Sequence, residues 1–115
     1  MTVATVDVNT TPDGTLVIEL HGTLDAEAAV GLRHALVDAV RHTRPLRLVM
    51  DLAEVEDLDP ISLATLAAAC GFGDDHQVAV FLDHPSAAIA ASLTEAGIPR
   101  HRLRFVGSQR VSRSI

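Results

Sequence analysis

The spacing of hydrophobic and polar residues changes several times along the chain, and each change marks a predicted element. The stretches TVATVDV and TLVIELHG are rich in β-branched residues and flank the turn sequence TPDG at residues 11–14, which predicts a pair of strands. Residues 25–42 follow helical spacing, with Asp25 placed to cap the helix; the predicted buried stripe consists of Ala29, Leu32, Leu36 and Ala39. The continuous apolar run RLVMDL then predicts a strand that is covered on at least one face.

The second half of the chain repeats this alternation. Asp59 can cap a helix in which Pro60 takes the first position, where its missing N–H is not needed. In the helix sequence ISLATLAAACGF only Ser62 and Thr65 are polar, so we expect it to be largely buried or to offer an apolar face to a partner. QVAVFLD predicts a strand, SAAIAASLTEAG a helix and LRFVG a last strand. Strands that alternate with helices predict an α/β domain with one sheet.

Length and composition support one globular domain. The chain has 115 residues, of which 48% are hydrophobic and 21% are charged, so one core is expected without room for a second domain. We place this domain at residues 1–107 and expect the Arg- and Ser-containing tail at 108–115 to be flexible. No apolar run approaches the roughly 20 residues of a membrane span, and the first residues lack the order of a signal peptide. A cytoplasmic protein without membrane insertion is therefore expected.

The charged residues exclude several classes of function. All nine basic residues are arginine, and without lysine the chain has no Schiff-base amine and no phosphate-binding lysine of the P-loop type. Residues 1–99 contain all fifteen acidic residues and four of the arginines, whereas residues 100–115 contain five arginines and no acidic residue. An acidic body repels phosphate backbones, so no nucleic-acid partner is expected.

Metal, cofactor and thiol chemistry have little support in the spacing of the residues. The six histidines form no HxH or HExxH pattern, and none has a cysteine at ligand spacing. Cys70 is the single cysteine and lies in an apolar helical stretch, where packing is favoured over reactivity. We therefore expect no metal site and no cofactor.

The acidic run DLAEVEDLD at residues 51–59 is the one candidate for catalysis. Carboxylates that follow a strand can hold Mg²⁺ or accept a phosphoryl group, and Asp51 and Asp57 are the candidates. Phosphoryl-transfer sites of this type also use a basic side chain, typically a lysine, which this chain lacks. We favour a solvent-exposed loop that ends in a helix cap, and an Mg²⁺-dependent aspartyl phosphoryl acceptor is the alternative.

Three stretches in order resemble the STAS domain of anti-sigma factor antagonists. LVIELHGTLDAEAAVGLRHAL is similar to a strand, the family's glycine–x–leucine–aspartate and the first helix. LRLVMDLAEVEDLDPISLATL is similar to the central strand and second helix, and SAAIAASLTEAGIPRHRLRF to the late helix and closing strand. The resemblance covers about residues 5–107 and implies a mixed sheet of four to five strands with helices packed over one face.

The resemblance also implies a function and a binding surface. Members of this family bind an anti-sigma factor or a serine kinase-like protein through the loop before the second helix and the start of that helix. Carried over to this chain, the expected partner-binding residues are Asp25, Asp57, Asp59, Pro60, Ile61, Ser62, Leu63 and Thr65.

One departure from the family pattern changes the expected mechanism. The family commonly has aspartate-serine-serine-glycine-leucine at this point, and the second serine accepts a phosphate. The aspartate aligns with Asp59 and the leucine with Leu63, so the phosphoacceptor position holds Ile61. We expect binding without this switch, and Ser62, at the family's glycine position, is the alternative phosphate acceptor. A STAS accessory subunit of a transporter complex is a further reading that keeps the same fold.

Overall fold

Side-chain burial in the first two strands divides the sheet into a covered face and an open face. The computed structural model describes residues 5–107, so the predicted tail at 108–115 lies outside the described residues. Strands β1 (Thr5–Thr10) and β2 (Thr15–Leu24) pair antiparallel, as the sequence predicts. Along β2 the even-numbered residues Leu16, Ile18 and Leu20 are buried, while Val17, Glu19 and His21 are partly exposed on the opposite face. Successive strand residues point to opposite faces, so the even-numbered set faces the core.

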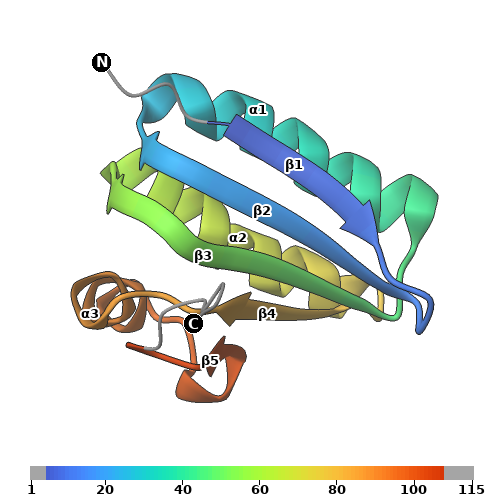
Figure 1. Ribbon diagram of the computed structural model, residues 1–115. Coiled ribbons are helices and arrows are strands. Elements are labelled where there is room, and N and C mark those ends of the chain that lie inside the picture. Colours follow the sequence, from blue (N-terminus) through green and yellow to red (C-terminus); the bar gives the residue numbers. More distant parts are fainter. Residues whose placement is uncertain (1–4, 108–115) are drawn as a thin grey trace, which may run out of the picture.

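The remaining elements complete a five-stranded mixed sheet with three helices. In chain order they are α1 (Ala26–Asp38), the π-helical turn η1 (Ala39–Thr43), β3 (Arg47–Leu58), α2 (Pro60–Asp75), β4 (Ala79–Asp83), α3 (Ala87–Glu95), the 3₁₀ turn η2 (Arg100–Arg102) and β5 (Leu103–Arg104). The strand order is β1-β2-β3-β4-β5, and every neighbouring pair after the first is parallel. Helices α1 and α2 lie side by side behind the sheet, and α3 lies below β3, at the lower left (Figure 1). The predicted α/β fold is confirmed.

The core forms between the covered face of the sheet and the helices. The predicted stripe of the first helix is buried, with Ala39 falling in the π-helical turn that follows α1. Helix α2 approaches β4 closely at Gly73, where an added Cβ would lie 2.5 Å from a methyl group of Val80. No helix in the described part of the chain is both long and apolar enough to cross a membrane.

Candidate functional site

Two strand-to-helix junctions meet at one end of the sheet. Parallel neighbouring strands end at the same edge, so the exits of β2 and β3 lie together. The backbone N–H of Asp59 donates a hydrogen bond to the carbonyl of Leu24 at 2.8 Å. The hydroxyl of Ser62 donates to the carbonyl of Asp25 at 2.9 Å. These two hydrogen bonds fix the start of α2 against the start of α1.

Both helices begin at the capping residues that the sequence predicts. The Asp25 carboxylate accepts a hydrogen bond from the N–H of Ala28 at 2.8 Å, and the Asp59 carboxylate accepts one from Ile61 at 2.7 Å. Pro60 occupies the first position of α2. The positive ends of the two helix dipoles stabilise these carboxylates, so both aspartates have a structural role as caps.

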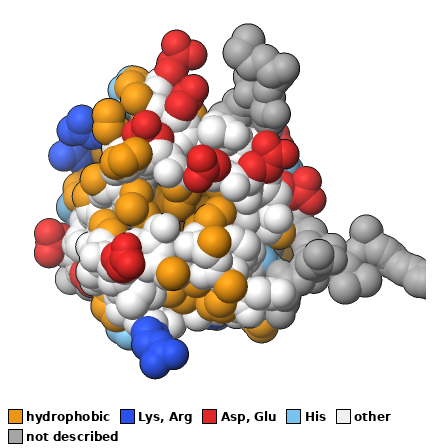
Figure 2. All heavy atoms as spheres, turned by 90° about the vertical axis from the view of Figure 1, so that its left-hand side faces the viewer, with side chains coloured by type: hydrophobic (Ala, Val, Ile, Leu, Met, Phe, Trp, Pro, Cys, Tyr) orange, Lys and Arg blue, Asp and Glu red, His pale blue; other side chains and the backbone are white. Residues whose placement is uncertain are grey.

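The first turn of α2 exposes an apolar side chain at this end. Ile61 has 56% of its surface exposed, which is high for a large aliphatic residue, and Pro60 is exposed beside it. Leu63 is partly buried and packs against the core, and the Thr65 hydroxyl donates to the carbonyl of Ile61 at 2.9 Å. Figure 2 shows this end of the molecule, where hydrophobic side chains gather near the middle.

Acidic side chains lie beside this apolar surface at the two strand-to-helix junctions. Asp25 and Asp57 are exposed, as are Glu27 and Glu56 beside them. The Asp57 carboxylate accepts a hydrogen bond from the N–H of Leu58 at 2.9 Å, which holds it at the end of β3. Figure 2 shows acidic side chains above and to the right of the hydrophobic area. An apolar surface with acidic groups beside it is complementary to an apolar pocket with basic residues at its margin.

The expectation that Ser62 faces a partner is wrong. Its side chain has no exposed surface, because it lies between the two helix starts and donates to the carbonyl of Asp25. The family's glycine at this position is small, and serine is the next larger residue that can add a hydrogen bond here. The hydroxyl is therefore out of reach of a kinase in the folded chain.

The expectation of a loop for the acidic run is also wrong, because β3 continues to Leu58. The run pairs with β2 from Asp51 to Leu58, with register shifts between Glu19 and His21 and between Gly22 and Thr23. Asp51 is buried on the open face, accepts from Ala53 at 3.0 Å and lies 3.5 Å from the Nδ1 atom of His84. Six residues of strand separate Asp51 and Asp57 by about 20 Å, so the two carboxylates do not form one phosphoryl-accepting site.

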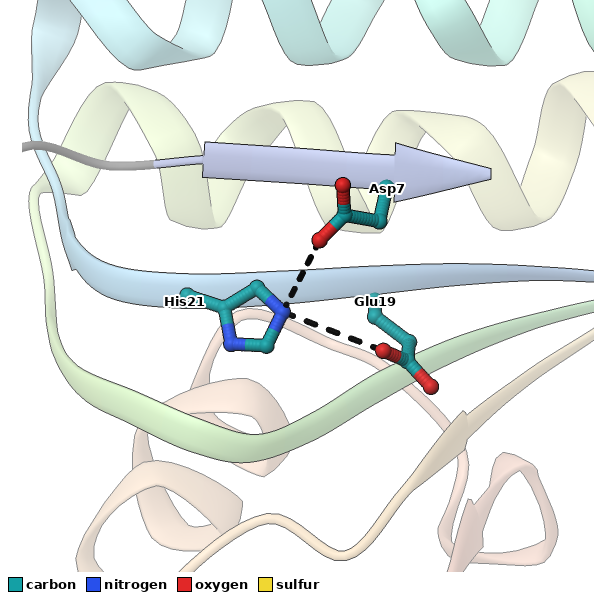
Figure 3. Close-up of side chains that lie close together, drawn as sticks. All are labelled: Asp7, Glu19 and His21. Carbon is teal, nitrogen blue, oxygen red and sulfur yellow. Dashed lines mark ion pairs between the residues drawn. The ribbon is translucent and has the colours of Figure 1, made fainter. Parts of the chain in front are cut away.

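The open face of the sheet brings together three residues that the spacing of the histidines does not reveal. The Nε2 atom of His21 lies 3.3 Å from Asp7 and 3.8 Å from Glu19 (Figure 3). One ligand atom from each of the three residues falls within 4.8 Å of the others, which is close enough for a shared cation. These contacts are ion pairs when His21 is protonated. In the sequence these residues share only odd-numbered positions in predicted strands, which places Glu19 and His21 on one face of their strand. The pairing of Asp7 with Glu19 in the register of β1 on β2 then brings Asp7 to the same place.

The comparisons with known proteins identify the family. The family model described as "Mlab, STAS domain" matches residues 9–106. No curated protein sequence matches the chain.

Solved structures agree with this assignment. An anti-sigma factor antagonist from Mycobacterium paratuberculosis is 26% identical, with a TM-score of 0.76 over 90% of this chain and 86% of that chain. RsbS from Moorella thermoacetica is 20% identical, with a TM-score of 0.75 over 92% and 87% of the two chains. A sulfate transporter family protein from Wolinella succinogenes is 18% identical, with a TM-score of 0.70 over 84% and 80%. Because the family model spans most of the chain and the fold agrees with it, the chain belongs to the STAS domain family.

Proposed function

We propose that this chain is a regulatory binding module of the anti-sigma factor antagonist type. Its partner would be an anti-sigma factor or a serine kinase-like protein in the cytoplasm. The proposed contact residues are Asp25, Asp57, Asp59, Pro60, Ile61, Leu63 and Thr65. The observation that carries the proposal is the exposed Ile61 side chain on the capped first turn of α2. The likeness to the antagonist from Mycobacterium paratuberculosis supports the class of partner.

The geometry favours binding over chemistry. The apolar area lies on a surface where two hydrogen bonds join the strand-to-helix junctions, so little conformational freedom is lost when a partner docks. Residues near the centre of an interface, surrounded by contacts that exclude water, contribute most of the binding energy, and Ile61 takes this central position on the proposed surface. The acidic rim selects a partner with basic residues at the matching positions.

The same residues support binding without a phosphorylation switch. A phosphate at a helix N-terminus adds nearly two negative charges and changes how a partner docks. Ile61 has no hydroxyl to accept a phosphate, and the hydroxyl of the neighbouring Ser62 is buried. Regulation of this chain would then depend on partner concentration or on a change in the partner.

Capture of the partner from a lysate of the native host tests the proposal. The bait proteins are the wild type, Ile61→Glu and the control Leu46→Glu, and bound proteins are quantified by mass spectrometry. Leu46 is 70% exposed and precedes β3, at the opposite end of that strand from the site. We expect an anti-sigma or kinase-like protein with wild type and Leu46→Glu but not with Ile61→Glu. Retention of this protein by Ile61→Glu would contradict the proposed surface.

A second candidate is a subunit that regulates a transporter. The structural match to the sulfate transporter family protein from Wolinella succinogenes favours it, since the two chains share the fold over most of their lengths. The same capture experiment separates the two candidates. Recovery of a transporter component or its ATPase, in place of an anti-sigma or kinase-like protein, would select the second function.

A further inference from the structure

A groove runs from Ile61 along the seam between α1 and α2. Its volume is about 640 Å³. On the α2 side Ile61, Ala64, Ala68 and Phe72 follow one another at helical spacing and line the groove. The two alanines are exposed, so this wall is apolar, shallow and open to solvent.

The opposite side of the groove, formed by α1 and the turn η1 that follows it, carries positive charge. Arg33 and Arg41 line it and are exposed, with the apolar Val37 between them. Neither arginine forms an ion pair with any residue in the range 5–107, whereas Arg102 and Arg104 pair with aspartates. The Arg41 guanidinium carbon lies 5.9 Å from the centre of the Phe72 ring, which places this charge at the far end of the groove.

The groove therefore has acidic residues at one end and basic residues along one wall. Acidic Asp25 and Asp59 flank the end at Ile61, and Arg33 of α1 and Arg41 of η1 follow the opposite wall away from it. A ligand that fits this pattern is apolar on one face, basic at one end and acidic along one side.

An α-helix meets these requirements better than a strand or a lipid. From Ile61 to Phe72 the groove is about 16 Å long, which corresponds to three turns of helix. A docked strand would need free backbone groups on the walls, and both walls are helices whose backbone groups are already paired. A lipid headgroup calls for cations gathered at one point, whereas Arg33 and Arg41 are eight residues, or about 12 Å, apart.

We infer that the groove binds an amphipathic helix of the protein partner. Apolar side chains of this helix lie over Ala64 and Ala68, and two of its carboxylates, seven or eight residues apart, pair with Arg33 and Arg41. Basic residues at one end of the helix lie near Asp25 and Asp59. This inference rests on the proposed function, because the groove begins at Ile61 and extends that surface along α2.

Photo-crosslinking in cells of the native host tests the inference. p-Benzoylphenylalanine replaces Phe72, which lines the groove, and in the control it replaces Phe105, an exposed phenylalanine after β5. We expect the probe at position 72 to label one protein, on a helical segment with two carboxylates seven or eight residues apart. The Arg33→Glu, Arg41→Glu double variant should lower the yield about tenfold. The exposed control Arg100→Glu should leave it unchanged.

Each other outcome contradicts the inference that the groove binds a helix of the partner. The inference would be overturned if position 72 formed no adduct, or formed one with a lipid or with a non-helical segment. It would also be overturned if the charge reversal left the crosslinking yield unchanged. If the double variant still binds the partner while Ile61→Glu does not, the groove is wrong and the proposed function stands. If Ile61→Glu also binds, both fail.

Discussion

The hydroxyl of Ser62 donates a hydrogen bond to the backbone carbonyl of Asp25 across a sequence separation of 37 residues. This contact joins the first turn of α2 to the cap of α1, and a second hydrogen bond, from Asp59 to Leu24, lies beside it. The proposed binding surface includes side chains from both junctions. Its shape therefore depends on a side chain that no partner can touch.

Ser62→Ala is expected to lower the free energy of unfolding by about 1 kcal/mol, the usual contribution of such a hydrogen bond. The Asp25 carbonyl still accepts from the N–H of Ala29, which limits the loss. Ser62→Glu buries a charge without a partner and should cost about 3–5 kcal/mol. Urea denaturation followed by circular dichroism measures both values.

Thr65→Ala is the matched control, since the partly exposed Thr65 hydroxyl donates to the carbonyl of Ile61 within its own helix. It should change stability by less than about 0.5 kcal/mol. Equal effects of Ser62→Ala and Thr65→Ala would show that the interhelix hydrogen bond contributes nothing.

Ile61→Glu should separate binding from stability. The side chain is exposed, so the change is expected to alter the free energy of unfolding by less than about 0.5 kcal/mol. The affinity for the partner should fall at least about 30-fold, as for a central hot-spot residue. Titration calorimetry with the purified partner gives the affinity, with Leu46→Glu as control. A large loss of stability would mean that the folded domain needs this side chain.

Wild-type protein should remain unphosphorylated when it is incubated with its partner, ATP and Mg²⁺. The exposed position has no hydroxyl, and Ser62 is buried. Ile61→Ser restores an exposed hydroxyl and is the positive control if the partner is a kinase. Intact-mass spectrometry measures the adduct, and a phosphopeptide that maps to Ser62 in the wild type would contradict the prediction. Acetyl phosphate and Mg²⁺ should likewise leave no adduct that hydroxylamine removes.

The turn between β1 and β2 should make stability depend on pH. Hydrogen bonds from the hydroxyl of Thr11, and then from Thr15, hold the pKa of Asp13 below its ordinary value of 3.8. The folded state therefore favours the carboxylate, which contributes to the free energy of unfolding. This contribution is fully present above pH 3.8 and is lost as the pH falls towards the lower pKa of the folded state. Asp13→Asn should destabilise the protein at pH 7, by an amount that shrinks below pH 3.8. Thermal unfolding across this range tests it, and a difference that is constant with pH would contradict the assignment.

Cys70 should react slowly with thiol reagents in the folded protein. Burial raises the pKa of its thiol above the ordinary value of 9.0, so the thiolate is scarce at neutral pH. Reaction with a chromogenic disulfide at pH 8 should become fast only in denaturant. Fast labelling under native conditions would show that α2 opens locally at this residue.

Local signals in the sequence were sufficient for most of the elements. The predicted caps Asp25 and Asp59 each accept the hydrogen bond that this role predicts, and Ser86 caps α3 in the same way. The donor and acceptor of each capping hydrogen bond are two or three residues apart, so both partners can be recognised in one short stretch of sequence. The predicted packing of Cys70 is confirmed for the same reason, because it follows from helical spacing.

Features that depend on partners far along the chain could not be predicted. The acidic half of β3 lacks a regular alternation, and β2 pairs with it through two register shifts. The last strand is only two residues long, Leu103–Arg104, because its extent depends on pairing with β4. Ser62 is a polar residue in a mostly apolar helix, which is typical of an exposed position. Its burial results from the approach of α1 to α2.

Hydrogen exchange of the purified complex with its partner, read by mass spectrometry, tests the central claim most directly. Binding at the start of α2 should slow exchange in residues 59–65 and in residues 25–30 at the start of α1, relative to the free protein. The strands β1 and β4 should exchange as they do without the partner. Protection confined to the open face of the sheet, with residues 59–65 unchanged, would contradict the account.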